Sequence, residues 1–275
     1  MKLLIVGGKG MAGHMLTQYF KKKTRYEVHF TSRDLEESEG YYLDVRDYNR
    51  VKEIIESVKP DIVINAVGIL NDQASQKKIA AIQVNSLLPH QLANLLDQYG
   101  ARFIHISTDC VFSGKRGDYK EGDFPDGTSD YAKTKVLGEV ISPHHLTVRT
   151  SIIGPELKDN GIGLFLWFMK QKGEIKGYKK VYWNGVTTLE LSKAIEKMIV
   201  QNITGLYHLS SATKISKYEL LKLFQEIFEK KDVMIKPDCE IALDRTIQNT
   251  RDGFDYLVPS YEDMLIQLKD WMGNK

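Results

Sequence analysis

The chain has 275 residues, of which 42% are hydrophobic and 27% are charged, and its formal net charge is +2. These values are typical of a globular protein, and the interspersed acids and bases argue against a surface for nucleic acid or for a membrane. We expect a cytoplasmic protein, because no signal-like segment precedes the first predicted strand and no apolar run could span a bilayer. Two cysteines, Cys110 and Cys239, are too few for a disulfide framework or a zinc ligand set, and we expect no metal site.

The first twenty residues combine a predicted strand, a glycine cluster and a predicted helix. Residues 1–6 are mostly apolar, and Gly7, Gly10 and Gly13 follow with the spacing G-x-x-G-x-x-G. Such glycines allow a tight turn, a close approach of the backbone to a phosphate, and close packing of the helix on the strand. A strand before and a helix after them predict a dinucleotide site, with the pyrophosphate at the start of the helix. The alternative is an ordinary glycine turn.

The end of the second predicted strand, residues 26–31, indicates which nicotinamide cofactor binds. Proteins that bind NAD carry an acidic residue there for the adenosine ribose hydroxyls. This chain has Thr31, Ser32 and Arg33 instead. A hydroxyl and a guanidinium suit a 2′-phosphate, so the sequence favours NADPH over NADH. In the alternative, Arg33 is a solvated loop residue, Asp34 binds the ribose and NADH is the cofactor.

Predicted strands and helices alternate through the next hundred residues. Residues 43–45 are the expected end of a third strand, where Asp44 either accepts from the adenine amino group or caps a helix that begins near Tyr48. A buried strand is expected over 60–68, a long helix interrupted by Pro89 over 80–99, and another strand over 102–107. This alternation predicts the α/β class with a doubly wound parallel sheet, the Rossmann arrangement.

The second half is expected to hold strands over 178–183 and 205–209 and four helices. The helices are predicted over 164–172, 188–199, 217–228 and 261–271, the second of them capped by Thr187 or Thr188. His208 lies among strand residues, so we expect it to be packed in the core rather than catalytic.

Three side chains in the first half suit acid–base chemistry. Tyr131 and Lys135 are four residues apart, which places them on one face of a predicted helix. A nearby ammonium lowers the pKa of a phenol and makes it a usable general acid or base. The hydroxyl of Thr108, at the end of the preceding strand, is positioned to bond a substrate carbonyl. The pair alone is also common on exposed helices. Cys110 lacks an evident base partner, so we interpret it as a small buried filler rather than a nucleophile.

Together, the glycine turn, the strand-end hydroxyl and Tyr-x-x-x-Lys resemble the extended short-chain dehydrogenase/reductase superfamily. Residues 107–112, 131–139 and 148–151 resemble, within it, the dTDP-4-dehydrorhamnose reductase family. The resemblance implies NADPH-dependent reduction of the 4-keto group of a dTDP- or UDP-linked deoxysugar, for a surface polysaccharide or glycan. It also implies a Rossmann domain over 1–155, a smaller substrate-binding lobe over 156–275 with chain interleaving, and a homodimer.

Carried over by position, the resemblance assigns roles to individual residues. Tyr131 would donate the proton to the nascent alkoxide, Lys135 would lower its pKa and hold the nicotinamide ribose, and Thr108 would bind the carbonyl oxygen. The implied cofactor contacts are Gly7, Gly10, Met11 and Gly13 at the pyrophosphate, Ser32 and Arg33 at the 2′-phosphate, Asp44 and Val45 at the adenine, and Ala66, Val67 and Gly68 along the cleft, besides Tyr131 and Lys135. The implied substrate contacts are Asp109, Asn184 and Arg245, the last two with a purely structural role as the alternative.

Some positions depart from the family pattern. Cys110 stands where the family usually has tyrosine, Ile152 where it has tryptophan, and Asn184 begins the segment that replaces a Gly-x-Pro-Thr element. These changes leave the sugar and its nucleotide open. The rival interpretations are a nucleotide-sugar epimerase or dehydratase of the same superfamily and a non-catalytic NADP-binding regulatory subunit.

Overall fold

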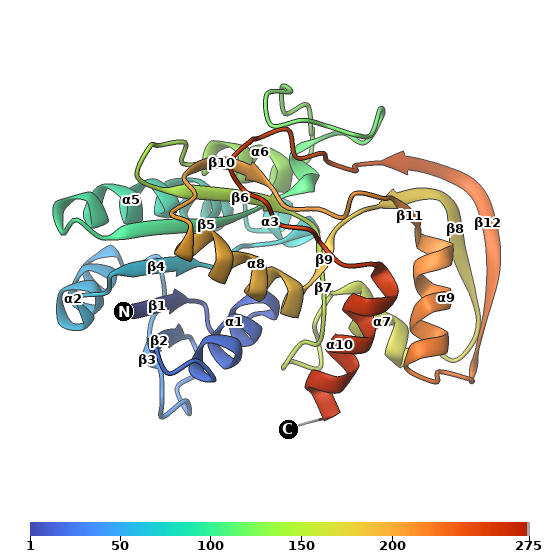
Figure 1. The fold of residues 1–275 in the computed structure, drawn as a ribbon, viewed down its shortest axis with the longest axis horizontal. Coiled ribbons are helices and arrows are strands. Elements are labelled where there is room, and N and C mark those ends of the chain that lie inside the picture. Colours follow the sequence, from blue (N-terminus) through green and yellow to red (C-terminus); the bar gives the residue numbers. More distant parts are fainter. Residues whose placement is uncertain (274–275) are drawn as a thin grey trace.

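Seven parallel strands form the central sheet of the computed structural model, which describes residues 1–273 (Figure 1). Their order is β10-β6-β5-β4-β1-β2-β3. The strands are β1 (Lys2–Val6), β2 (Glu27–Ser32), β3 (Tyr41–Tyr42), β4 (Ile62–Asn65), β5 (Arg102–Thr108), β6 (Leu146–Thr150) and β10 (Gly205–His208). The predicted α/β class with a parallel sheet is confirmed.

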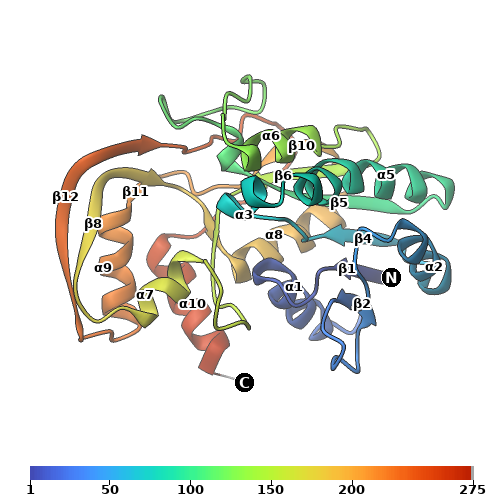
Figure 2. The same ribbon diagram turned by 180° about the vertical axis from the view of Figure 1, so that it is seen from behind.

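Helices cover both faces of this sheet, because alternate residues of its strands are apolar on each side. Leu3 and Ile5 of β1 pack toward α1 (Met11–Lys21) and α8 (Thr188–Val200), which cover the face seen in Figure 1. Leu4 and Val6 of β1 pack toward α2 (Tyr48–Val58) and α5 (Leu88–Gln98), which cover the face seen in Figure 2. The central strands are therefore buried on both sides.

A smaller lobe lies beside one end of the large sheet. It contains a three-stranded sheet in the order β11-β8-β12, and its core joins α7 and α9 to that sheet. Its elements are α7 (Leu164–Lys170), β8 (Gly173–Trp183), β11 (Ile215–Ser216), α9 (Lys217–Ile227), β12 (Val233–Asp244) and α10 (Tyr261–Gly273), and β7 (Ile152–Ile153) pairs with β9 (Val186–Thr187) near the junction. Between the lobe segments, α8 and β10 return to the large sheet, although both follow residue 155.

Several predicted boundaries shift in the structure. The third strand ends at Tyr42, so residues 43–45 follow it instead of ending it. The prediction that Asp44 caps the next helix is wrong, because Asp47 accepts the hydrogen bond from the backbone N–H of Arg50. The predicted helix over 80–99 consists of α4 (Lys78–Ala81), a π-helical turn (Ile82–Leu87) and α5. Pro89, which has no N–H to donate to the preceding turn, lies in the first turn of α5, directly after the wider π-helical turn. A short helix, α3 (Asn71–Gln76), precedes them.

Of the two residues predicted to cap α8, Thr187 and Thr188, the structure confirms Thr187. The side chain of Thr187 accepts a hydrogen bond from the backbone N–H of Glu190. Strand β12 was not predicted, because its burial does not alternate regularly and Pro237 lies within it, which argues against a strand.

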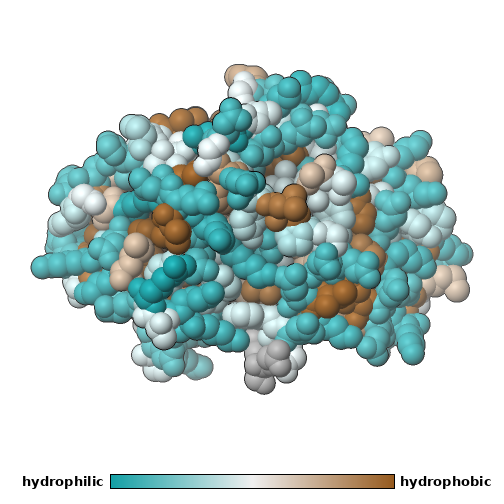
Figure 3. Space-filling view, viewed as in Figure 1, coloured by the Kyte–Doolittle hydropathy of each residue, from teal (hydrophilic) through white to brown (hydrophobic). Residues whose placement is uncertain are grey.

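The surface seen in Figure 3 is mostly hydrophilic, with small, separate hydrophobic patches. Within residues 1–273, no helix combines the length and the apolar character needed to cross a bilayer.

Gly13 of α1 packs closely against the backbone of the glycine turn at Gly7. A Cβ at Gly13 would overlap the carbonyl oxygen of Gly7, which is backbone and cannot rotate away. We predict that Gly13→Ala lowers the free energy of unfolding by about 1–3 kcal/mol, the usual cost of overpacking. Urea denaturation followed by circular dichroism measures this change.

Gly122→Ala is the matched control, because a Cβ there meets no atom within 4 Å. A Gly13→Ala protein as stable as this control would contradict the close packing of α1 on the turn.

Candidate active site

The glycine turn presents the start of α1 as an open group of N–H donors. Gly7 has a φ of 88°, a conformation that glycine adopts readily, and its N–H donates to the Thr31 hydroxyl at the end of β2. Gly10 precedes the first residue of α1, Met11, and no side chain caps this helix. The first turn also lacks an acidic residue. Its N–H groups and positive helix end are therefore suited to a phosphate.

The side chains at the end of β2 differ in their availability to a ligand. The Ser32 hydroxyl is buried and accepts a hydrogen bond from the backbone N–H of Asp34 at 3.0 Å. The Asp34 carboxylate accepts from the backbone N–H of Glu36. Arg33 is exposed between them. Of these three, the guanidinium of Arg33 is the group best placed to reach a 2′-phosphate.

Asp44 follows β3 at the same edge of the sheet. Its carboxylate accepts from Arg46 Nε at 2.9 Å and from the backbone N–H of Arg46 at 3.1 Å. These hydrogen bonds from Arg46 lower the pKa of Asp44 to about 2. The carboxylate is thus ionised at neutral pH and available as an acceptor, with buried Val45 beside it.

Asn85 joins the loop after β4 to the helix that carries Tyr131 and Lys135. The Asn85 side-chain oxygen accepts from the backbone N–H of Ile69 at 2.8 Å, and its amide donates to Ile69 O and to the Thr134 hydroxyl. Thr134 lies on α6 (Asp130–Leu137), which carries Tyr131 and Lys135. The loop that contains Ala66, Val67 and Gly68 is therefore fixed relative to α6. We had not assigned Asn85 a role, although a buried asparagine on an amphipathic helix is a signal of such a bond.

Tyr131 and Thr108 meet at the end of β5. Burial raises the pKa of Tyr131, the nearby Cys110 thiol raises it further, and a hydrogen bond with the Thr108 side chain opposes them. Burial outweighs this hydrogen bond in the structure, and the effect of Lys135 on the pKa of Tyr131 stays a prediction. The phenol consequently stays protonated, the form that a proton donor needs.

The Lys135 ammonium is buried against strand β5. Its Nζ donates to Ile106 O at 2.8 Å and lies 3.0 Å from His105 Nε2, and the side chain is 3% exposed. Burial lowers the pKa of Lys135 to about 8, against the attraction of Glu139. Glu139 itself forms a buried ion pair with Arg149, whose Nη2 lies 2.7 Å from Oε2. Lys135, Glu139 and Arg149 thus form a buried group of charged side chains beside β5.

Asp109, Cys110 and Arg245 form the side of the site that faces the small lobe. Asp109 Oδ1 accepts from the Thr108 hydroxyl at 3.1 Å, and burial raises its pKa. Arg245 Nε donates to Phe112 O at 3.0 Å, and Arg245 Nη1 lies 3.9 Å from the Cys110 sulfur. Burial raises the pKa of Cys110 to about 12, so the thiol stays protonated and is no nucleophile.

Asn184 has a structural role in this arrangement. Its amide donates to Ser211 O and to Ile247 O, and its oxygen accepts from the backbone N–H of Ile247. Because these bonds engage both ends of its amide, the structure gives no support to a substrate contact at Asn184.

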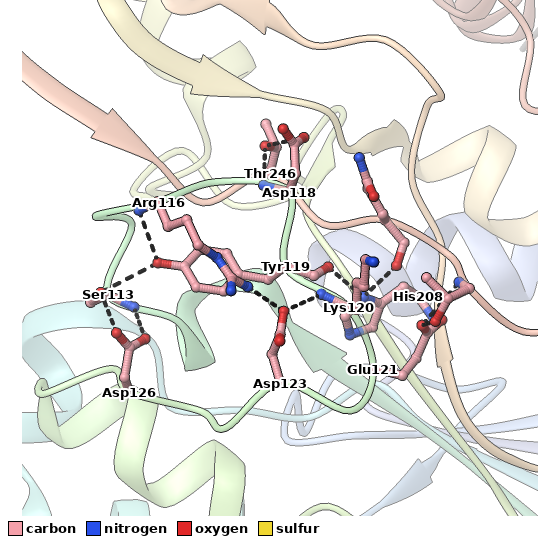
Figure 4. Close-up of polar contacts among 12 residues, drawn as sticks. Ser113, Arg116, Asp118, Tyr119, Lys120, Glu121, Asp123, Asp126, His208 and Thr246 are labelled. Atoms are coloured by element: carbon pink, nitrogen blue, oxygen red, sulfur yellow. Dashed lines mark hydrogen bonds and ion pairs between the residues drawn. The ribbon is translucent and has the colours of Figure 1, made fainter.

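The segment that carries Arg245 is held against the loop after Phe112 (Figure 4). The backbone N–H of Asp244 donates to Gly114 O, and that of Tyr119 donates to Thr246 O. Figure 4 shows the polar contacts that continue from this loop to the end of β10, where the Glu121 carboxylate accepts from the backbone N–H of His208. The expectation that His208 is packed is confirmed, since it is fully buried. Arg245 therefore has a fixed position relative to Thr108.

Comparison with known proteins identifies the family. A family model described as the RmlD substrate binding domain matches residues 1–246. The dTDP-4-dehydrorhamnose reductase of Aggregatibacter actinomycetemcomitans is 31% identical over 244 residues, covering 84% of this chain and 80% of that protein. The methionine adenosyltransferase 2 subunit beta of Xenopus tropicalis is 24% identical over 251 residues, covering 86% and 75% of the two chains.

A solved structure agrees with the fold over nearly the whole length. The dTDP-4-dehydrorhamnose reductase from Bacillus anthracis, in complex with NADP, has a TM-score of 0.83 over 98% of this chain and 99% of that one, at 22% identity. Because the family model covers most of the chain and a 31%-identical relative matches along most of its own length, the chain belongs to the RmlD substrate binding domain family.

Proposed function

We propose that the chain reduces the 4-keto group of a dTDP- or UDP-linked deoxysugar with NADPH. The observation that carries this proposal is the hydrogen bond between Thr108 and Tyr131, with the buried Lys135 one helical turn after Tyr131. Thr108 lies at the carboxyl end of β5, on the same side of the sheet as the glycine turn that follows β1. Similarity to a dTDP-4-dehydrorhamnose reductase and to a reductase structure that holds NADP supports it. The product would supply a deoxysugar for a surface polysaccharide or glycan, and we further propose a homodimer in the cytoplasm.

The residues at the end of β5 and on α6 would perform the acid–base part of the reaction. The Tyr131 hydroxyl would bind the carbonyl oxygen, and the Thr108 hydroxyl would do so once its single proton turns from Asp109 to that oxygen. NADPH, when bound, would supply the hydride for the carbonyl carbon. Tyr131, kept protonated by burial, gives its proton to the oxygen as negative charge develops there. The Lys135 ammonium stabilises the phenolate that remains.

The cofactor would occupy the open edge of the sheet. Gly7, Gly10, Met11 and Gly13 would surround the pyrophosphate at the start of α1, Arg33 and Ser32 would bind the 2′-phosphate, Asp44 and Val45 would flank the adenine, and Ala66, Val67 and Gly68 would line the cleft up to Tyr131 and Lys135. The uncapped start of α1 and the exposed Arg33 fit a phosphorylated dinucleotide. Asp109 and Arg245 would contact the substrate.

Replacing Tyr131 with phenylalanine tests the proton donor. We predict that Tyr131→Phe lowers kcat by roughly 10²–10⁴-fold, the usual contribution of a general acid, and leaves the Kd for NADPH within about twofold. Consumption of NADPH with a dTDP-linked 4-keto-6-deoxysugar measures kcat, and cofactor fluorescence measures Kd.

Tyr99→Phe is the matched control, since Tyr99 is exposed and its hydroxyl contacts only the Glu56 carboxylate among the described residues. A Tyr131→Phe protein with the kcat of this control would rule out Tyr131 as the donor.

The charge on Lys135 predicts an alkaline limit to activity. Its pKa is lowered to about 8, so the ammonium is present below that pH and is lost above it. We therefore expect kcat to fall as the pH rises through about 8, because the neutral amine no longer stabilises the phenolate. The pH profile of kcat measures this, and a profile that stays flat to about pH 10, where an ordinary lysine titrates, would contradict it.

Arg33 provides a test of the cofactor preference. We predict that Arg33→Ala raises the KM for NADPH by about 10–100-fold, the cost of losing a charge-assisted hydrogen bond, and leaves the KM for NADH nearly unchanged. Initial rates with each cofactor measure the two constants. Arg50→Ala is the control, because Arg50 is an exposed residue of α2 paired with Glu53. Equal effects of Arg33→Ala on both cofactors would show that Arg33 does not bind the 2′-phosphate.

A further inference from the structure

A second lysine near the end of β5, Lys217, comes from the small lobe. It is the first residue of α9, and the helix start is fixed by a capping box in which Ser216 and Glu219 bond each other's backbone N–H groups. Strand β11, which leads into α9, pairs with β8 through Ile215 and Trp183. The Lys217 ammonium lies 5.1 Å from the centre of the Trp183 ring. Its position is thus set by three elements of the lobe.

The ammonium of Lys217 lies near enough to Asp109 and Cys110, the two residues that follow Thr108, for the charged forms of both to attract it. Protein surrounds it closely enough that burial lowers its pKa to about 8, against the attraction of Asp109, and yet the side chain keeps accessible surface. Asp109 is likewise enclosed and partly accessible. Both groups are therefore largely enclosed by protein, and each keeps surface that a ligand could contact.

Lys217 and Asp109 are close enough to attract each other but are not in direct contact. Within residues 1–273, the Lys217 ammonium makes no hydrogen bond and no ion pair shorter than 4.0 Å. A lysine ammonium has three donors and no acceptor, whereas a carboxylate only accepts. A donor and an acceptor side by side, both with unused capacity, are complementary to two neighbouring hydroxyl groups, each of which donates and accepts.

Lys217 and Asp109 lie near the position proposed for the reacting carbonyl. Asp109 is bonded to the Thr108 hydroxyl, which in the proposed function holds the carbonyl oxygen. Arg245, also partly accessible, lies on the same side beside Cys110. The sugar carbons next to the carbonyl would therefore face Asp109 and Lys217.

We propose that Lys217 and Asp109 together recognise two vicinal hydroxyl groups of the substrate sugar, the one on the carbon next to the reduced carbonyl and the one on the following carbon, with Lys217 donating to one oxygen and Asp109 accepting from the other hydroxyl. This inference rests on the proposed function, because it needs a keto sugar at Thr108 and Tyr131. It makes Lys217 a specificity residue for vicinal hydroxyls, contributed by the small lobe.

The test compares Lys217→Met with the wild-type protein on two substrates. One is a dTDP-linked 4-keto-6-deoxysugar, and the other is its analogue without the hydroxyl next to the carbonyl. We expect Lys217→Met to raise the KM for the first sugar by about tenfold or more, to leave the KM for NADPH within about twofold, and to remove most of the wild-type preference for the hydroxylated sugar. Lys217→Arg, which keeps the charge and the donors, should recover part of that preference.

Lys179→Met is the matched control, since Lys179 is an exposed lysine of the same lobe that lies over an aromatic ring, that of Tyr218. Thermal unfolding of each variant shows whether it is folded, and Lys217→Gln, which removes the charge but keeps a polar side chain, takes the place of the methionine variant if that variant is not folded.

Two failures of this experiment are distinguishable. If the wild-type protein turns over the sugar and Lys217→Met keeps the same KM and the same preference, the inference is overturned alone. Equal increases in the KM for the sugar and for NADPH would also overturn it, because they indicate a structural role between the lobes. If the wild-type protein consumes no NADPH with any dTDP- or UDP-linked keto sugar, the proposed function fails and the inference fails with it.

Discussion

The buried ammonium of Lys135 is the group on which the geometry of the site depends. A charge under the end of a sheet strand is costly unless it is bonded, and here it donates to Ile106 O and lies against His105. These bonds fix the rotation of α6 about its own axis. Tyr131, one helical turn earlier, is thereby held against Thr108.

The parallel sheet brings the other parts of the site to the same edge. The carboxyl ends of β1, β2, β4 and β5 lie together because all these strands run in one direction. The glycine turn, Arg33, the loop 66–68 and Thr108 follow those four ends in turn. Asn85 and the contacts of the 244–247 segment then join the loops to α6 and to the small lobe.

Local patterns in the sequence predict the sheet, the glycine turn and the Tyr131–Lys135 helix, because each depends on neighbouring residues. What they do not predict depends on residues far apart in the chain. Asn184 bonds Ser211 and Ile247, and no spacing in the sequence indicates those partners. The pKa of Tyr131 is raised by burial between elements, which opposes the effect expected from Lys135 alone. In the sequence, Lys217 is simply the first residue of a predicted amphipathic helix, and only the fold brings it near Asp109.

The most direct test of the account follows the hydrogen atom itself. The protein would be given NADPH carrying deuterium at both C4 positions of the nicotinamide, together with a dTDP-linked 4-keto-6-deoxysugar, and the sugar product would be analysed by mass spectrometry. A ketoreductase would place one deuterium in each product molecule and form one NADP⁺ for each. An unlabelled sugar product with the cofactor unchanged would contradict a ketoreductase and would indicate an enzyme that returns its hydride.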